Sequence, residues 1–367
     1  MSIFRAIRSV PPVLKKYRYR LLMSIAITWT LIDSIYMTFK YYVFGAENDY
    51  HFFEYRQVST LILREVLVFL TSCMIAYLLV FRQQRMHKRR SLVVSFLLNT
   101  LLLLIISFVF NLLFHFLYSI LITGLSVSTA IYQFFHDAFY TYWLLQKIPH
   151  WILIFFVTML VLELAEKYSP GVFRDILIGK YLQPRIEKRI VMFLDLKDST
   201  PIAEKLGGKE YFRFIRDFIY FVSIAMIEYN GRIYQYVGDE VVVSWLFNPR
   251  NTKRCMDSLI EARRLLQRNS NKFRSLYGVA PEFRVGIHIG DVTVGEIGVI
   301  KKDIAMSGDT MNTTARIRGA CSDLNHKFLV SKTFAEMMDF KEWQVENLGV
   351  VDLKGKKEGV ELVALKI

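Results

Sequence analysis

Two acidic residues lie at the ends of short apolar runs and are the first candidates for chemistry. Asp195 follows the run RIVMFL, and Asp239 lies within YQYVGDEVVVSW, between two runs rich in β-branched residues. Read alone, Gly238-Asp239-Glu240 is the solvated turn of a β-hairpin. If the two aspartates meet, their charges repel unless a cation lies between them, and carboxylate oxygens favour Mg²⁺ or Mn²⁺.

A candidate phosphate-binding element follows Asp195 directly. The residues LKDST open a predicted helix, and free backbone N–H groups at a helix N-terminus attract anions. Asp198, Ser199 and Thr200 are therefore candidate substrate-binding residues, and Ser199 is also a candidate helix N-cap. Metal ligands beside a phosphate cradle indicate a substrate that carries phosphate groups.

The elements that must position these residues form an α/β domain over 188–367. The expected elements are a buried strand in RIVMFLD, a helix over 199–229 with a break at Gly207-Gly208, the hairpin, an amphipathic helix in TKRCMDSLIEARRLLQRNSNKF and two strands around a turn in FRVGIHIGDVTVGEIG. This order, β-α-β-β-α-β, is the ferredoxin-like unit with extra elements. Strands one and three are neighbours in it, so Asp195 and Asp239 should lie at one edge of the sheet. We expect the helices on one face and a partner on the other.

Five motifs carry a family resemblance: FLDLKDST, YQYVGDE, RVGIHIGDVTVGEIG, SGDTMNTTARIRGA and LKGK, in this order. Over about 188–366 the chain resembles the catalytic domain of class III nucleotide cyclases. The resemblance implies a head-to-tail homodimer with two equivalent active sites at the subunit interface. It also implies two Mg²⁺ or Mn²⁺ ions per active site, held by Asp195, Asp239 and the backbone carbonyl of Leu196.

The same resemblance implies roles for three further residues. Asn312 would orient the ribose, Arg316 would stabilise the transition state, and Lys354 in LKGK would hold the triphosphate. Asn312 and Arg316 are four residues apart and so share one helix face. In each active site the aspartates and the helix that carries Asn312 and Arg316 would come from opposite subunits, so that one chain alone is inactive.

The base-selecting positions depart from the family's patterns. Gln235 and Ala305 stand where adenylate and guanylate cyclases each carry other residues. We favour ATP as the substrate, converted to 3′,5′-cyclic AMP and pyrophosphate. The alternatives are a guanylate cyclase and a catalytically degenerate nucleotide-binding membrane receptor. A diguanylate cyclase also has a Gly-Asp-Glu hairpin, but Asn312, Arg316 and LKGK do not belong to that family.

The first half of the chain is predicted to be an α-helical transmembrane bundle. Hydrophobic residues make up 53% of the sequence and are concentrated before residue 166. A bilayer core of about 30 Å needs about 20 helical residues. The predicted spans are 21–44, 60–81, 92–120 and 149–166. The aromatic segment 127–145 is expected to be interfacial or re-entrant, and Asp33 to pair across helices or to sense a signal.

Charge sets the expected orientation. The net charge is +14, and basic clusters flank the apolar segments, notably RQQRMHKRR at 82–90, which favours a lipid bilayer and not nucleic acid as partner. By the positive-inside rule the N-terminus and the catalytic domain are cytoplasmic, at the plasma (inner) membrane. The organisation expected is a membrane domain at 1–166, a connector at 167–187 and a catalytic domain at 188–367. The connector is either a short dimerising helix or a plain linker, and the upstream signal is unknown.

Overall fold

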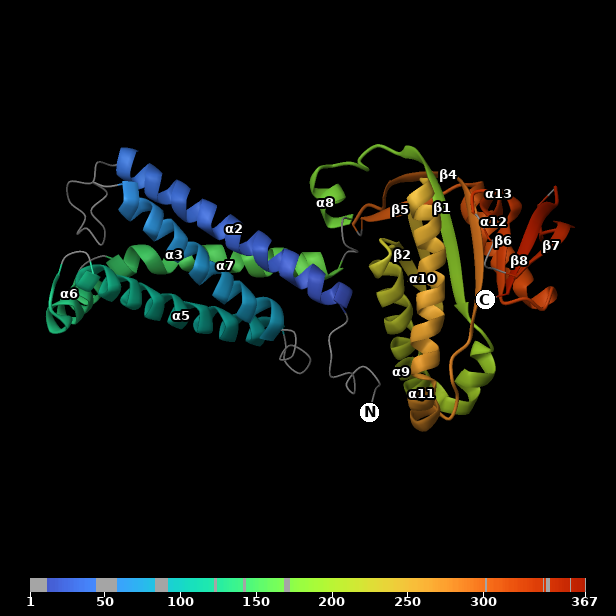
Figure 1. Ribbon diagram of the computed structural model, residues 1–367, viewed down its shortest axis with the longest axis horizontal. Coiled ribbons are helices and arrows are strands. Elements are labelled where there is room, and N and C mark those ends of the chain that lie inside the picture. Colours follow the sequence, from blue (N-terminus) through green and yellow to red (C-terminus); the bar gives the residue numbers. More distant parts are fainter. Residues whose placement is uncertain are drawn as a thin grey trace. The chain divides into compact units, whose positions relative to one another are not determined.

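The computed structural model describes residues 12–43, 58–82, 92–121, 124–140, 143–167, 172–300, 302–338, 340, 344–356 and 358–366. The chain divides into two compact units: Leu14–Leu164 form one, and Ala165–Ile367 together with Met1–Val13 form the other (Figure 1). Most of the basic cluster at 82–90 and the breaker Pro170-Gly171 lie outside the described residues.

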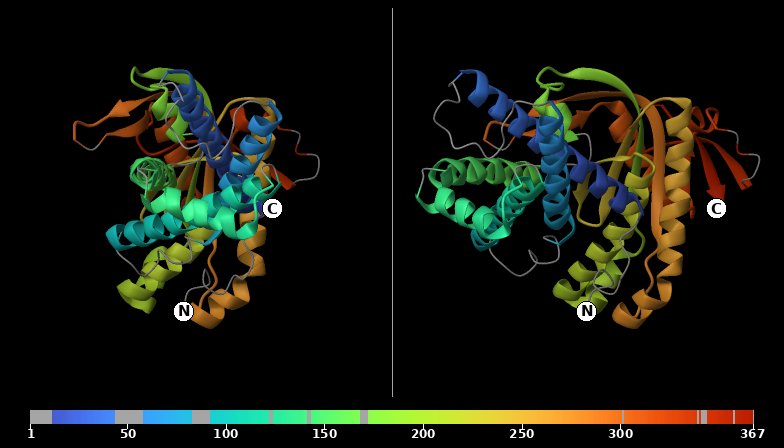
Figure 2. Two further views of the ribbon diagram at one scale, coloured as in Figure 1. Left: turned by 90° about the vertical axis from the view of Figure 1, so that its left-hand side faces the viewer. Right: turned by 60° about the vertical axis from the view of Figure 1, so that its left-hand side comes forward.

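Long helices make up the N-terminal unit (Figures 1 and 2). They are α2 (Pro12–Val43), α3 (Val58–Tyr77) continued by the π-helical turn η2 (Leu78–Arg82), α5 (Leu92–Leu121), α6 (Val127–Tyr140) and α7 (Trp143–Lys167). Trp29, Ala76, Leu103 and Phe155, one each from α2, α3, α5 and α7, share an apolar core. Each of these four helices covers the greater part of one predicted span. The four helices therefore form where the apolar runs predict them.

The four-span membrane bundle is not established by these helices. Within the described residues only Arg64–Phe81 is long and apolar enough to cross a bilayer, and 33% of it is buried; Thr100–Phe110 and Ile148–Leu162 are shorter apolar stretches. The aromatic segment at 127–145 begins with α6, which folds against α5 through Phe108 and Phe134, whose ring centroids are 5.6 Å apart. Whether α6 is interfacial or re-entrant stays a prediction.

Asp33 pairs across helices, as expected. Arg64 of α3 donates to Asp33 of α2, and its Nη1 also donates to Glu65 Oε1 over 2.6 Å. Arg64 is 8% exposed. A buried charge is tolerated when it is paired, and the carboxylates of Asp33 and Glu65 pair with the Arg64 guanidinium between these apolar helices. A sensing role for Asp33 stays a prediction.

The C-terminal unit is built on an eight-stranded sheet. The strands are β1 (Arg185–Leu196), β2 (Arg232–Val237), β3 (Glu240–Leu246), β4 (Phe283–Ile297), β5 (Asp303–Ser307), β6 (Phe328–Ser331), β7 (Gln344–Val351) and β8 (Val360–Lys366). Their order is β2-β3-β1-β4-β6-β8-β7, with β5 paired to β4. The first four strands therefore have the order of the predicted ferredoxin-like unit, which is confirmed.

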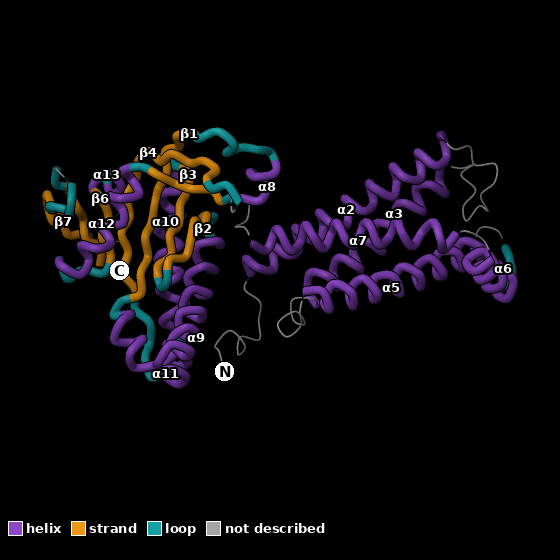
Figure 3. The backbone as a smooth tube through the Cα atoms, turned by 180° about the vertical axis from the view of Figure 1, so that it is seen from behind, coloured by secondary structure: helices purple, strands orange, loops and turns teal. Residues whose placement is uncertain are grey.

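Helices cover both faces of this sheet. On one face α9 (Ser199–Glu228) and α10 (Pro249–Arg268), followed by α11 (Ser270–Tyr277), bury Met192, Leu194 and Val243 among others (Figure 3). The predicted break in α9 occurs at Gly207, which has a φ of 72°. On the other face lies α12 (Asp309–Asp323), whose Met311 packs with Val191 and Phe193. The expectation that all helices share one face is therefore wrong.

Two glycines of β4 explain the position of α12. A Cβ on Gly286 would lie 2.4 Å from the backbone N of Arg318, and one on Gly290 would lie 2.5 Å from Thr310 Oγ1. The helix thus rests directly on the strand. The prediction of a turn within FRVGIHIGDVTVGEIG is wrong, because β4 runs through this segment without a break. Gly290 continues the β1–β4 ladder opposite Arg189 and gives room to a helix.

The connector packs against the catalytic domain of its own chain. It contains α8 (Val172–Leu177), whose Asp175 is 2% exposed and accepts a hydrogen bond of 2.6 Å from Arg232 Nη1 at the start of β2. Tyr181, 4% exposed, packs on the α12 face of the sheet. The plain-linker interpretation is therefore wrong, and pairing of α8 with its copy in a dimer stays a prediction.

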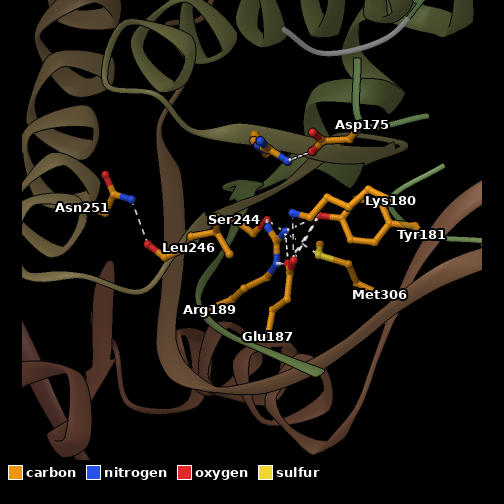
Figure 4. Close-up of polar contacts among 10 residues, drawn as sticks. Asp175, Lys180, Tyr181, Glu187, Arg189, Ser244, Leu246, Asn251 and Met306 are labelled. Atoms are coloured by element: carbon orange, nitrogen blue, oxygen red, sulfur yellow. Dashed lines mark hydrogen bonds and ion pairs between the residues drawn. The ribbon is translucent and has the colours of Figure 1, made fainter. Parts of the chain in front are cut away.

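A buried polar cluster joins the end of the connector to β1 and β3 (Figure 4). Arg189 on β1 donates to Glu187 Oε2 over 2.6 Å and to Ser244 Oγ over 2.9 Å, and Lys180 lies 3.0 Å from Glu187 Oε1. Burial by itself would raise the pKa of Glu187, but its hydrogen bonds to Lys180 and Arg189 hold that pKa below the ordinary value. The cluster ties 180–189 to β3, at the opposite end of β1 from Asp195.

Candidate active site

Strand pairing brings Asp195 and Asp239 to the same edge of the sheet. Leu194 of β1 pairs with Val241 of β3, so the next residue on β1 and the turn before β3 lie at one end. The turn is tight because Gly238 has a φ of 62°, which favours glycine. The predicted convergence of the two aspartates is confirmed.

Burial and mutual repulsion mark this edge as a site for cations. Burial raises the pKa of Asp195, the charge of Asp239 adds to the rise, and Arg318 and Arg284 oppose it. Burial also raises the pKa of Glu240, again against the effect of Arg318. One carboxylate oxygen of Asp239, Oδ2, is buried without a hydrogen-bond partner. Three carboxylates crowd together here, and Glu240 Oε2 also lacks a hydrogen bond of good geometry, although it forms an ion pair with Arg318.

These residues fit Mg²⁺ or Mn²⁺. The described residues hold no group of three or more His, Cys, Asp and Glu side chains suited to a metal ion. Mg²⁺ usually binds through one or two carboxylates together with substrate phosphates, which suits a pair of aspartates with one unsatisfied oxygen. Leu196, the third expected ligand through its backbone carbonyl, ends β1 directly after Asp195.

The N-terminus of α9 follows within three residues. The helix begins at Ser199, so the N-cap is Asp198 and not Ser199. Asp198 has the left-handed φ of 57° and makes no side-chain cap bond. Because Pro201 has no N–H group, the backbone donors of this first turn are those of Ser199 and Thr200. They lie at the same end of β1 as Asp195 and are suited to an anion.

A second group of candidate residues gathers around α12. Asn312 is exposed and Arg316 is half-buried. A Cβ on Gly355, in the turn between β7 and β8, would lie 3.4 Å from Arg316 Nη2. In the same turn Lys356 Nζ lies 2.8 Å from Asp309 Oδ2, and Lys354 is exposed. The structure therefore brings Arg316 and the LKGK turn together.

This second group lies on a different side of α12 from Asp195. Arg318, two residues after Arg316, lies with its Nη1 3.3 Å from Asp195 Oδ2. Residues two apart on a helix differ by about 200° in direction. Arg316 thus contacts the β7–β8 turn while Arg318 contacts Asp195, so the two groups of candidate residues lie on different sides of α12.

The two base-selecting positions lie on β2 and β5, which do not pair with each other in the sheet. Gln235 is exposed on β2, beside a bulge in the β2–β3 ladder, and Ala305 is half-buried on β5, opposite Gly295 of β4. The backbone N of Met306 donates to Tyr234 Oη over 3.0 Å. This bond joins the residues next to Gln235 and Ala305 and keeps the two positions close.

Comparison with known proteins identifies the domain. Residues 182–366 match the adenylate and guanylate cyclase catalytic domain. The chain belongs to this family. The resemblance inferred from the five motifs is thereby confirmed for the catalytic domain, but not for a multi-span membrane domain.

Relatives of this cyclase domain include named adenylate cyclases. The chain is 30% identical over 210 residues to "Adenylate cyclase 2" of Rhizobium meliloti (strain 1021), covering 56% of this chain and 57% of that protein. It is 25% identical over 224 residues to "Adenylate cyclase" of Anabaena cylindrica, covering 56% and 43%. The chain thus spans about half the length of these curated relatives or less. A solved bacterial light-regulated adenylyl cyclase has a similar fold, with a TM-score of 0.51, 19% identity and coverage of 59% of this chain and 64% of that one.

Sequence reasoning missed two residues of the cyclase site. From the sequence, Glu240 is expected only as part of the hairpin turn, and Arg318 is not singled out. In the structure Arg318 Nη2 lies 2.5 Å from Glu240 Oε2. Two signals were available in the sequence. Arg318 lies on the helix face opposite Arg316, and the hairpin carries a second carboxylate, Glu240, directly after the expected metal ligand Asp239.

Proposed function

We propose that the chain is a membrane-anchored homodimeric adenylate cyclase, which converts ATP to 3′,5′-cyclic AMP and pyrophosphate. One observation carries the proposal. In a domain of the cyclase family, Asp195 and Asp239 converge on one side of α12, while Arg316 contacts the β7–β8 turn on another side. Such a chain is complete only when a second copy supplies the missing half of each site.

The residues of the aspartate half bind the reacting phosphates. Asp195, Asp239 and the Leu196 carbonyl would hold two Mg²⁺ or Mn²⁺ ions, which when bound activate the attacking 3′-hydroxyl and neutralise the triphosphate. The backbone N–H groups of Ser199 and Thr200, with Asp198 as the cap, bind phosphate oxygens at the start of α9.

The other half-site is supplied by the second subunit. Asn312 orients the ribose so that its 3′-oxygen lies in line with the α-phosphorus. Arg316 donates hydrogen bonds to the charge that develops on the α-phosphoryl oxygens. Lys354 in the exposed β7–β8 turn binds the triphosphate. The proton of the 3′-hydroxyl leaves as the new phosphodiester bond forms and pyrophosphate departs.

The preference for ATP is supported by the named relatives and by Gln235. The two relatives described above are adenylate cyclases by name. The amide of Gln235 can both donate and accept a hydrogen bond at a purine edge. Guanylate cyclase activity is the second candidate, because neither Gln235 nor Ala305 follows the usual pattern for adenine.

The membrane anchor is supported by the surface of the N-terminal helices. Large apolar residues there face outward, among them Leu31, Ile35, Leu101 and Leu153, which are 57%, 67%, 56% and 62% exposed. A soluble helical bundle would cover such residues or replace them with polar ones. We place the N-terminus and the catalytic domain on the cytoplasmic side of the plasma (inner) membrane, with the bundle as anchor and signal input.

Product analysis tests this proposal. Purified full-length protein is given Mn²⁺ with ATP or GTP separately, beside Asp239→Ala and the control Asp323→Ala, which removes an exposed aspartate at the end of α12. We expect cyclic AMP from wild type and Asp323→Ala and none from Asp239→Ala. Cyclic GMP alone would reverse the substrate. The absence of product from folded, dimeric protein would favour a nucleotide-binding receptor.

A further inference from the structure

The aspartate half-site contains one carboxylate more than its metal ions need. Glu240 follows Asp239 directly and pairs across β2–β3 with Val237, at the mouth of the same hairpin. Its side chain is 12% exposed, against 20% for Asp195. A third buried carboxylate beside two metal ligands adds repulsion and offers the ions a competing oxygen.

Arg318 balances this extra charge from the same chain. Its Nη2 lies 2.5 Å from Glu240 Oε2 and its Nη1 lies 3.3 Å from Asp195 Oδ2, so the two ends of one guanidinium contact two carboxylates. A guanidinium suits this task because its donors are fixed in a plane. The Asp239 oxygen that lacks a hydrogen-bond partner, Oδ2, is a different atom from the two carboxylate oxygens that Arg318 contacts.

The backbone places Arg318 where it can do this. The close approach of α12 to β4 at Gly286 brings the backbone N of Arg318 onto the strand. On the neighbouring strand Asp195 pairs in register with Arg284, two residues before Gly286. The side chain of Arg318 therefore extends over β4 toward Asp195 and the hairpin, while Arg316 extends elsewhere.

We propose that Arg318 is a positioning residue of the metal half-site: it holds Glu240 away from the ions and orients Asp195, so that Asp195 and Asp239 remain the metal ligands. The inference rests on the proposed cyclase function. It acts within one chain, in contrast to Arg316, which serves the site formed with the second subunit.

A mixed dimer separates these two roles. Full-length Arg316→Ala and Asp239→Ala chains, carrying different tags, are co-expressed and purified together, so that one intact site forms from the aspartates of the first chain and the Arg316 of the second. Activity of this mixture tests the proposed dimer by itself. If both single variants and the mixture are inactive, the proposed function fails, irrespective of Arg318.

Arg318→Ala is then placed in one chain of the active mixture at a time. In the chain that supplies the aspartates we expect activity to fall about tenfold or more, because a buried carboxylate loses its charge partner. In the chain that supplies Arg316 we expect less than about a twofold change. Equal losses in both placements, or a loss only in the second, would overturn the inference.

Metal binding provides a readout that does not depend on turnover. Free Mn²⁺ is measured by electron paramagnetic resonance while full-length protein is titrated in the presence of an unreactive ATP analogue. We expect Arg318→Ala to weaken Mn²⁺ binding about tenfold and Glu240→Ala/Arg318→Ala to restore it to within about threefold of wild type, since the unpaired charge is gone. Mn²⁺ binding by Arg318→Ala equal to that of wild type would overturn the inference.

Two further variants control for folding and for loss of any arginine. Arg318→Lys keeps a charge but cannot bridge two carboxylates equally well, so we expect binding between that of wild type and Arg318→Ala. Arg264 makes an ion pair of the same length, 2.5 Å to Glu261 on α10, away from the hairpin. Arg264→Ala should bind Mn²⁺ as wild type does. If Arg318→Ala fails to fold, the Mn²⁺ affinity of Arg318→Lys is compared with that of Glu240→Ala/Arg318→Ala and of wild type. A Mn²⁺ affinity of Arg318→Lys equal to that of wild type would then contradict the inference.

Discussion

At the residue scale, buried charged groups in the catalytic domain are each held by particular neighbours. Arg318 opposes the charges of Asp195 and Glu240 at one end of β1, and Arg189 with Lys180 stabilises Glu187 at the other. Removing one member of such a pair leaves a buried charge without compensation, which costs more than the pair contributes. The interaction energy of each pair should therefore be measured with both single variants and the double variant.

His288 on β4 gives a pH prediction at this scale. Burial lowers the pKa of His288 to about 4, and Lys356 acts in the same direction against Asp309. The unfolded chain binds the proton near pH 6.5, so this histidine's contribution to stability is present above that pH. The contribution is lost as pH falls through the window from 6.5 to about 4.

Thermal unfolding of full-length protein between pH 7 and 4.5 measures this effect. We expect wild type to lose about 2 kcal/mol more than His288→Gln over that range. The glutamine does not titrate, and its amide can still bond Ser331 Oγ, which lies 2.8 Å from His288 Nδ1. Parallel curves for the two proteins would show that His288 is not protonated differently in the folded and unfolded states.

At the element scale, the position of α12 depends on the glycines beneath it. Gly286→Ala would place a methyl group 2.4 Å from a backbone atom, which no side-chain rotation relieves. We expect a loss of about 1–3 kcal/mol in stability and a large loss of cyclase activity, because α12 carries both Arg316 and Arg318. Stability is measured by thermal unfolding and activity by cyclic nucleotide formation.

Gly319→Ala is the matched control on α12 itself. A Cβ there meets nothing within 4 Å, and alanine has the better helix propensity, by up to about 1 kcal/mol. We expect equal or higher stability and retained activity. Equal behaviour of the two alanine variants would show that the close contact at Gly286 does not position α12.

The connector gives a second prediction at this scale. Asp175→Ala removes the buried carboxylate that joins α8 to Arg232 at the start of β2. We expect a loss of about 2 kcal/mol and faster hydrogen exchange over 172–181, because Arg232 loses the buried carboxylate that accepts its hydrogen bond. Asp175→Ala/Arg232→Ala should recover part of the loss. Unchanged exchange in Asp175→Ala would mean that the ion pair does not hold α8 in place.

At the scale of the whole molecule, the proposed dimer has a measurable consequence. A fragment beginning at Ala165, the boundary of the C-terminal unit, keeps α8 and the whole cyclase domain but lacks the helical bundle. If the bundle holds two domains together, specific activity of the fragment should rise with its concentration, whereas that of the full-length protein should not. Activity independent of concentration in both proteins would argue against this role of the bundle.

Local pattern alone determined much of this protein. The alternation and length of apolar runs predicted the N-terminal helices, the order of the first four strands and the break at Gly207, since these depend on residues close together in the chain. The meeting of Asp195 and Asp239 also followed, because that order leaves β1 and β3 as neighbours. The residues Asn312, Arg316 and Lys354 were recognised from motifs and not from geometry.

Only the tertiary structure decided what lies on the second face of the sheet. A glycine within an apolar strand can mark a turn or the close approach of a helix, and local pattern does not distinguish the two. Where the sequence predicted a turn within FRVGIHIGDVTVGEIG, Gly286 and Gly290 instead mark such an approach, which carries α12 onto β4. That contact is made between residues far apart in the chain. For the same reason Arg318, 123 residues after Asp195, could be assigned to the aspartates only once the fold had brought them together.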